Sequence, residues 1–342
     1  MSKALHLQSM EINCSPLETQ LFKKIGAAAD KLGVPAYLIG GFVRDKIIGR
    51  PTTDVDVVCI GDGIALAHEV AALFSPKPTV AFFKTFGTAQ IKIDDFIIEF
   101  VGARKESYAS DSRKPSVSPG SIEDDQNRRD FTINALAIGL HEAAFGKLVD
   151  PFGGLQAIQD KIIKTPLAPH QTFSDDPLRM LRGIRFACQL GYTIVPETLD
   201  AIADSAHRIS IISQERITEE LNKIMLCDKP SVGFDLLFKV GLLHKIFPQL
   251  VDLYGAENID GMGHKDNFYH TLQVLDNMAE STPDLWLRWA ALLHDIAKPA
   301  TKKFEEGFGF TFHGHEVVGA RMVPKIFTKL KLPLNEKMKL VQ

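Results

Sequence analysis

Two aspartates, Asp54 and Asp56, stand two residues apart in an otherwise apolar segment that ends at Ile60. Because side chains alternate along a strand, both carboxylates should lie on one face, with Val55 and Val57 on the other. Adjacent carboxylates repel each other unless a cation lies between them, and their oxygen atoms suit Mg²⁺ shared with substrate phosphates. We therefore predict a magnesium-dependent catalytic site at Asp54 and Asp56.

A glycine pair precedes these aspartates. Gly40 and Gly41 carry no Cβ, so a triphosphate can approach the backbone there. The short helix that should begin near Phe42 adds free N–H groups and the guanidinium of Arg44. Residues 37–60 thus predict a strand, a glycine turn, a short helix and a second strand.

Glu99 is a candidate third metal ligand. It lies on a predicted strand, 96–101, which Asp94 and Asp95 join to the strand 88–93 as a hairpin. A carboxylate on a strand beside the aspartates would complete a two-metal site. An exposed glutamate with no such role explains the residue equally well.

A long polar stretch, 102–125, predicts a mobile loop, of the kind that is either disordered or a functional lid. The polar residues Arg128, Arg129, Asp130 and Asn134 then precede or begin an apolar run. On spacing alone, a helix cap and a nucleotide contact explain these residues equally well.

Farther along, residues 174–190 predict a helix with Ser174 as its cap and Pro177 in its first turn. Its arginines, Arg179, Arg182 and Arg185, recur every three residues and form one row. Such a row is usually a solvated face. Because no acidic residue accompanies these three, the row favours contact with a phosphate or a base.

Five of the eleven histidines lie between His264 and His315, and His294 with Asp295 ends an apolar helix. Neutral imidazoles with a carboxylate are typical ligands of a transition metal, so the cluster predicts a metal site. An isolated core histidine is the usual alternative, and the clustering counts against it.

At 342 residues the chain should form two to four compact units. Helices are predicted over 16–32, 63–74 and 231–250, with another helix capped by Ser213. Composition is ordinary, and no apolar run is long enough to cross a membrane, so no membrane partner is expected.

The N-terminal segment is too polar for a secretory signal, and the four cysteines are scattered, which favours reduced thiols in the cytoplasm. The net charge of −3 does not favour a polyanion partner. A local basic surface would have to bind one, and the candidates are the arginine row and the lysine-rich segment from Lys325 to Lys339.

Together these motifs resemble the bacterial (class II) tRNA nucleotidyltransferases and poly(A) polymerases, specifically the CCA-adding type with an HD domain. The resemblance is carried by five segments in order, 38–56, 128–136, 150–154, 175–187 and 215–221. It implies an α+β nucleotidyltransferase head with a mixed sheet and helices over 1–165. An all-α neck and body over 166–255 and a helical HD domain over 256–342 would follow.

The resemblance also implies roles for individual residues. Asp54 and Asp56 would bind two catalytic Mg²⁺ ions, and the other positions would bind nucleotide. The triphosphate would contact Gly40, Gly41 and Arg44; the sugar and phosphates would contact Arg129, Asp130 and Asn134; the base would meet Asp176 and Arg179, with Arg182 beside them. The family usually has Glu where this chain has Asp175.

Base choice at Asp176 and Arg179 also has a chemical argument. A carboxylate accepts hydrogen bonds from the amino groups of cytosine and adenine, whereas uracil and guanine present an acceptor oxygen at that position. The pair would admit CTP and ATP and reject UTP and GTP. The 3′-hydroxyl of a tRNA would then attack the α-phosphate and release pyrophosphate.

The histidine region resembles HD-domain metal phosphohydrolases, with His270, His294 and Asp295 at the matching positions. That family closes its site with a later Asp, and no Asp follows Asp295 here. We therefore expect an incomplete HD domain, truncated at its C-terminal end. The alternatives left open are a poly(A) polymerase, an enzyme that adds only A or only C, an HD phosphohydrolase and a non-catalytic RNA-binding protein.

Overall fold

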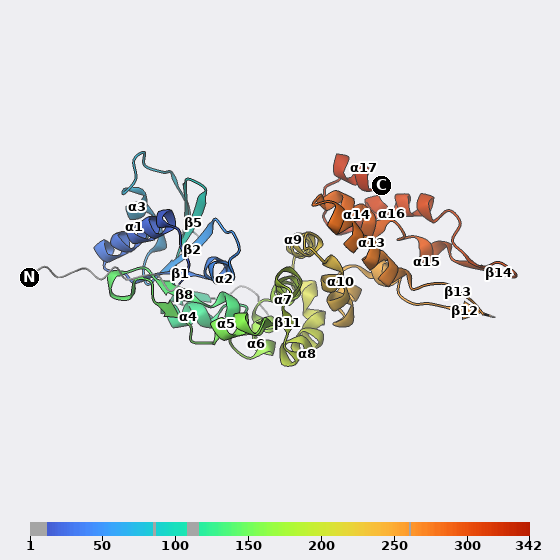
Figure 1. The fold of residues 1–342 in the computed structure, drawn as a ribbon, viewed down its shortest axis with the longest axis horizontal. Coiled ribbons are helices and arrows are strands. Elements are labelled where there is room, and N and C mark those ends of the chain that lie inside the picture. The colour runs from blue at the N-terminus through green and yellow to red at the C-terminus, as the bar shows by residue number, and fades with distance from the viewer. Residues whose placement is uncertain (1–11, 85–86, 108–115, 260) are drawn as a thin grey trace, which may run out of the picture. The chain divides into compact units, whose positions relative to one another are not determined.

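The computed structural model describes residues 12–84, 87–107, 116–259 and 261–342. The polar N-terminal segment and the centre of the predicted 102–125 loop lie outside these residues. The chain divides into two compact units, Met1–Ala168 and Pro169–Gln342 (Figure 1). The predicted domain limits at 165 and 255 stay predictions.

The first unit is built on a seven-stranded mixed sheet in the order β3-β4-β5-β2-β1-β8-β9. Neighbours pair antiparallel except β2 and β5, which are parallel. The strands are β1 (Ala36–Ile39), β2 (Asp54–Cys59), β3 (Val80–Phe83), β4 (Thr88–Ile93), β5 (Phe96–Gly102), β8 (Ala137–Gly139) and β9 (Leu148–Val149).

The predicted alternation along β2 is confirmed. Val55 and Val57 are buried in the core, whereas Asp54 is exposed and Asp56 is half-buried on the opposite face. The hairpin from β4 to β5 is also as predicted, with Asp94 in the left-handed region at its turn (φ 50°).

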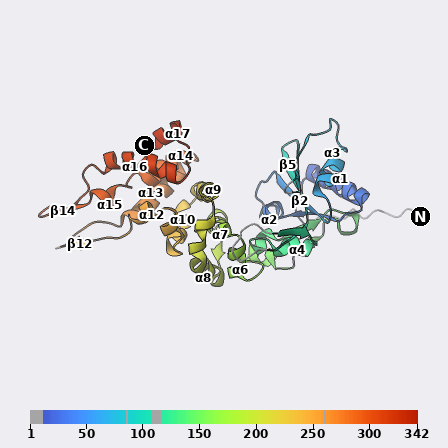
Figure 2. The same ribbon diagram turned by 180° about the vertical axis from the view of Figure 1, so that it is seen from behind.

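Helices α1 and α3 pack against each other, and α3 lies on β4 and β5 (Figures 1 and 2). Helix α1 has the predicted limits because Ser15 and Glu18 form a capping box and Gly33 ends the helix at φ 68°. The helices of this unit are α1 (Pro16–Leu32), α2 (Gly41–Ile48), α3 (Gly63–Ala71), α4 (Ile122–Asn127) and α5 (Gly154–Gln159), with short 3-10 turns at Thr132–Asn134 and Glu142–Ala144 and the strand β10 (Ile162–Ile163).

The prediction that residues 102–125 form a loop is partly wrong. Strands β6 (Arg104–Ser107) and β7 (Ser116–Pro119) pair antiparallel within it, and α4 begins at Ile122 with Ser121 as its cap. The apolar run after Asn127 does not form a helix. It forms a 3-10 turn and then β8.

The second unit is helical. Its helices are α6 (Pro169–Asp175), α7 (Leu178–Leu190), α8 (Pro196–Ser205), α9 (Gln214–Met225), α10 (Pro230–Lys239), α11 (Leu242–Ile246), α12 (Pro248–Val251), α13 (Asn267–Ser281), α14 (Leu285–Leu293), α15 (Lys298–Thr301), α16 (His315–Lys329) and α17 (Glu336–Val341), with a 3-10 segment at Ala206–Ile211. Short strands accompany them: β11 (Thr193–Ile194), β12 (Asn258–Ile259), β13 (Met262–Gly263), β14 (Lys303–Glu305) and β15 (Gly309–Thr311).

Two helix predictions in this unit are wrong in detail. The predicted helix 174–190 is two helices, because Pro177 has no N–H to continue α6 and instead caps α7. Ser174 therefore lies in the last turn of α6. The predicted helix 231–250 is divided into α10, α11 and α12, with Gly241 and Pro248 at the breaks.

Buried Arg288 connects the helices of the second unit. Its guanidinium donates to the backbone carbonyls of Met225, Cys227, Ala279 and Thr282. Because these carbonyls lie at or just beyond the C-terminal ends of α9 and α13, one side chain fixes both helix ends against α14. Among the described helices, none combines the length and apolar composition needed to cross a bilayer. The predicted fold class, a mixed-sheet head followed by helical body and HD regions, is confirmed.

Candidate active site

The three candidate metal-binding carboxylates of the first unit share one face of the sheet. Asp56 and Glu99 are register partners on the parallel strands β2 and β5, and Asp54 lies two residues before Asp56. Burial raises the pKa of Glu99, and the neighbouring charge of Asp56 raises it further. This oxygen-only donor set, with a surplus of negative charge, fits a hard divalent cation.

The glycine turn brings the strand β1 up to these carboxylates. Gly40 has φ 79°, and a Cβ there would lie 2.9 Å from Nη1 of Arg129 and 3.4 Å from Oδ2 of Asp56. Only glycine combines this backbone conformation with this close approach. The turn thus brings both Arg129 and Asp56 close to the N-terminus of α2.

A chain of buried hydrogen bonds connects Arg44 to the segment after α4. Nη1 of Arg44 donates to Oδ1 of Asn134 at 2.6 Å, and the Asn134 amide donates to Oδ1 of Asp130 at 3.0 Å. Asp130 also accepts from the Phe131 N–H. A helix cap, one of the two interpretations of Asp130 and Asn134, does not describe them, because their side chains hold each other and Arg44 beside the glycine turn.

Asp125 is a buried residue that sequence analysis missed. Its carboxylate accepts from Arg128 and from Arg129, whose Nη2 lies 3.0 Å away. Burial would raise the pKa of Asp125, but the two guanidinium groups outweigh burial and hold that pKa below its ordinary value. The spacings of three and four residues in a helical turn could have indicated both pairs.

In the second unit, Asp176 lies at the break between α6 and α7. Oδ1 accepts from the Leu178 N–H at 3.1 Å, and Oδ2 pairs with Nη2 of Arg216 at 3.0 Å. Arg179 donates to the Thr172 carbonyl at 3.3 Å. The α6–α7 break therefore fixes Asp176, and Arg216 of α9 is a partner that sequence analysis did not assign.

The prediction that the arginine row contacts a phosphate or a base is wrong for Arg185. This side chain is buried, its Nε lies 2.6 Å from Glu220 of α9, and it stacks on Phe186. Arg182 is half-buried near the same ring. Arg185 thus joins α7 to α9 inside the unit and does not face a ligand.

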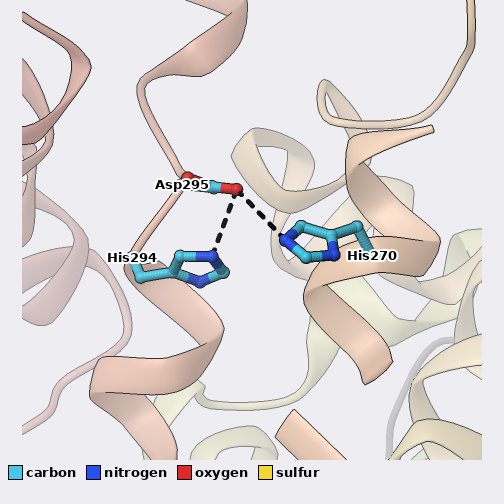
Figure 3. A group of neighbouring side chains, drawn as sticks. All are labelled: His270, His294 and Asp295. Atoms are coloured by element: carbon cyan, nitrogen blue, oxygen red, sulfur yellow. Dashed lines mark ion pairs between the residues drawn. The ribbon is translucent and has the colours of Figure 1, made fainter. Parts of the chain in front are cut away.

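The predicted histidine cluster is present in the second unit. His270 comes from α13, His294 follows α14, and the buried Asp295 comes next (Figure 3). Nε2 of His294 lies 3.1 Å from Oδ2 of Asp295, and the candidate ligand atoms of the three residues lie within 4.8 Å of one another. Two imidazoles and a carboxylate at this spacing fit a transition metal.

Two further residues reach Asp295. Nε2 of His315 lies 3.5 Å from Oδ1, and Nζ of Lys298 lies 2.7 Å from Oδ2. His294 and His315 each place Nδ1 on a backbone carbonyl, which leaves Nε2 toward Asp295. Sequence analysis noticed His315 without assigning it; Lys298 could have been found at three residues from Asp295.

Comparisons with known proteins identify three family matches along the chain. A poly A polymerase head domain matches residues 36–164, a probable RNA and SrmB-binding site of polymerase A matches 191–253, and an HD domain matches 267–341. A solved tRNA nucleotidyltransferase complexed with a primer tRNA and an incoming ATP analog is 27% identical, with a TM-score of 0.64. That alignment covers 92% of this chain and 86% of the solved one.

Two curated relatives are similar in sequence. An A-adding tRNA nucleotidyltransferase of Halalkalibacterium halodurans is 39% identical over 213 residues, 61% of this chain and 48% of the relative. A multifunctional CCA protein of Nitrosococcus oceani is 31% identical over 313 residues, 87% of this chain and 70% of the relative. The chain thus spans about half the length of the first relative. It belongs to the family of tRNA nucleotidyltransferases and poly(A) polymerases.

Proposed function

We propose that this chain is a template-independent tRNA nucleotidyltransferase that adds C and A to the tRNA 3′ end from CTP and ATP. The observation that carries the proposal is the grouping of Asp56, Glu99, Gly40 and Arg129 around the central strands β1, β2 and β5 of the head sheet. Carboxylates for a metal and a glycine turn with arginines for a triphosphate are what nucleotidyl transfer needs.

Asp54, Asp56 and Glu99 would hold Mg²⁺. When bound, this ion would polarise the α-phosphate and lower the pKa of the attacking hydroxyl. Arg44 and Arg129 would bind the triphosphate oxygens beside the glycine turn. Because Asn134 and Asp125 already fix these guanidinium groups, little ordering entropy is lost when the nucleotide binds.

Base choice is proposed for Asp176, with Arg179 beside it. Arg216 and the Leu178 N–H hold one acceptor carboxylate in a fixed orientation. A fixed acceptor would receive the amino group of cytosine or adenine and would meet the lone pairs of uracil O4 or guanine O6. Both CTP and ATP therefore suit this position, as a CCA-adding enzyme requires.

The histidine cluster supports a second candidate function, a metal phosphohydrolase in the HD region. The two imidazoles and Asp295 fit a metal, and metal analysis of the purified protein would test that site. An Asp54→Ala variant that keeps the main activity while a His294→Ala variant loses it would favour this second function.

Incorporation of each labelled nucleoside triphosphate into tRNA that lacks its 3′ terminus tests the main proposal. We expect incorporation of CTP and ATP with Mg²⁺ and none of UTP or GTP. Product lengths on a sequencing gel separate C and A addition from A-only addition and from poly(A) synthesis. The proposal also expects the enzyme to act in the cytoplasm, in keeping with its four free cysteines.

A further inference from the structure

Helix α16 carries a row of basic side chains that the proposed chemistry does not use. Its inward face buries Val323, Ile326 and Phe327. Arg321, Lys325 and Lys329 are exposed, and at spacings of four residues they follow one line along the opposite face. Four residues of an α-helix rise about 6 Å, so the row is a regular array of cations.

Between Glu316 and Glu336 the charge is of one sign only. From Val317 to Asn335 the sequence has four basic residues, the three of the row and Lys331, and no Asp or Glu. Within the part of the chain that the structure describes, none of the three forms an ion pair, whereas Lys239 pairs with Asp235. A cation row without counter-charge on a protein of net charge −3 indicates an anionic partner.

Helix stability does not explain the row. Cations near a helix C-terminus are stabilised by the helix dipole, but this effect falls off within the last turn. Lys329 lies in that turn, and Arg321 lies two turns before it. An anionic membrane is also a poor partner, because a membrane-bound helix must expose its apolar face and the apolar face of α16 is buried in the unit.

We propose that this basic row of α16 (Arg321, Lys325 and Lys329) binds successive phosphates of an RNA backbone. The RNA is tRNA if the proposed function holds, and the row would then contribute affinity for the tRNA without sequence selection. The proposed nucleotidyl transfer uses none of these three side chains, so the row would supply substrate binding and no step of the reaction.

The test compares two triple variants with the same charge change. One replaces the row (Arg321→Gln, Lys325→Gln, Lys329→Gln), and the control replaces three exposed lysines elsewhere in the unit (Lys239→Gln, Lys245→Gln, Lys303→Gln). Direct tRNA binding is measured by fluorescence anisotropy between about 50 and 200 mM salt. We expect the row variant to reduce the slope of log K against log salt by about 3, and the control to leave it unchanged.

A gain-of-binding variant tests the same face independently of any folding defect. Thr328 is exposed beside the row, and Thr328→Arg should steepen the salt slope by about 1. Equal losses in both triple variants, or an unchanged slope in the row variant, would overturn the proposal. So would a row variant that loses binding to anionic phospholipid vesicles while keeping tRNA binding. Because binding is measured without nucleotide, failure here is distinct from failure to incorporate CTP or ATP.

Discussion

Replacing Asp125 by asparagine should destabilise the first compact unit by about 3 kcal/mol. The Asp125 side chain is fully buried, and the side chains of Arg128 and Arg129 are about one-fifth exposed. Removing one member of a buried ion pair costs about 3–5 kcal/mol because a charge is left uncompensated. Since both arginines reach water, we expect the lower end of that range.

The pH dependence of this loss follows from the pKa of Asp125. Burial acts to raise this pKa, and the charges of Arg129 and Arg128 act to lower it. The resulting pKa of Asp125 is below its ordinary value of 3.8. A carboxyl group whose pKa is lower in the folded state than in the unfolded state stabilises the fold at any pH above its unfolded-state pKa. This stabilisation is lost as the pH falls from the unfolded-state pKa through the folded-state pKa. The difference between wild type and variant should therefore be constant from pH 8 to 5 and shrink below about pH 4.

Urea unfolding followed by circular dichroism measures the difference. Both tryptophans, Trp286 and Trp289, lie in the second unit, so their fluorescence provides an internal control that Asp125→Asn should leave unchanged. A loss under about 0.5 kcal/mol, or a difference that persists undiminished to pH 3, would refute the assigned ion pairs.

Three further substitutions have clear expectations. Gly40→Ala and the control Gly33→Ala should each cost about 1 kcal/mol of stability, because both glycines have a positive φ. Only Gly40→Ala should also lower kcat/KM for the nucleotide, by tenfold or more, because its Cβ would lie 2.9 Å from the Arg129 guanidinium. Asp56→Asn should reduce single-turnover incorporation roughly 1000-fold, corresponding to about 4 kcal/mol of lost metal-assisted stabilisation, with tRNA binding unchanged. Arg185→Gln should leave Glu220 with Lys223 as its remaining cationic partner and lower the stability seen by tryptophan fluorescence by about 2 kcal/mol, while the preference for CTP over UTP stays at the wild-type value.

Features set by neighbouring residues could be predicted from the sequence. Helix α1 follows from a cap at Ser15 and a stop at Gly33, and the shared face of Asp54 and Asp56 follows from strand alternation. The break before α7 does not follow from local sequence, because Pro177 is equally acceptable in the first turn of a single helix over 174–190.

Features set by distant residues could not be predicted. Arg185 and Glu220 are 35 residues apart and meet only because α7 packs on α9, so local spacing shows no acidic partner for the arginine row. The contact of Arg216 with Asp176 spans 40 residues and has the same cause. The proposed base choice at Asp176 rests on a contact of this kind, because local spacing does not position a carboxylate.

The most direct test of the central claim is single-turnover incorporation on tRNAs that end before CCA, after C, or after CC, with each labelled nucleoside triphosphate in turn. We predict CTP incorporation on the first two tRNAs and ATP incorporation on the third, both abolished by Asp54→Asn. Incorporation of ATP alone would contradict the proposed addition of C and A, and incorporation that survives in Asp54→Asn would contradict the assignment of the site.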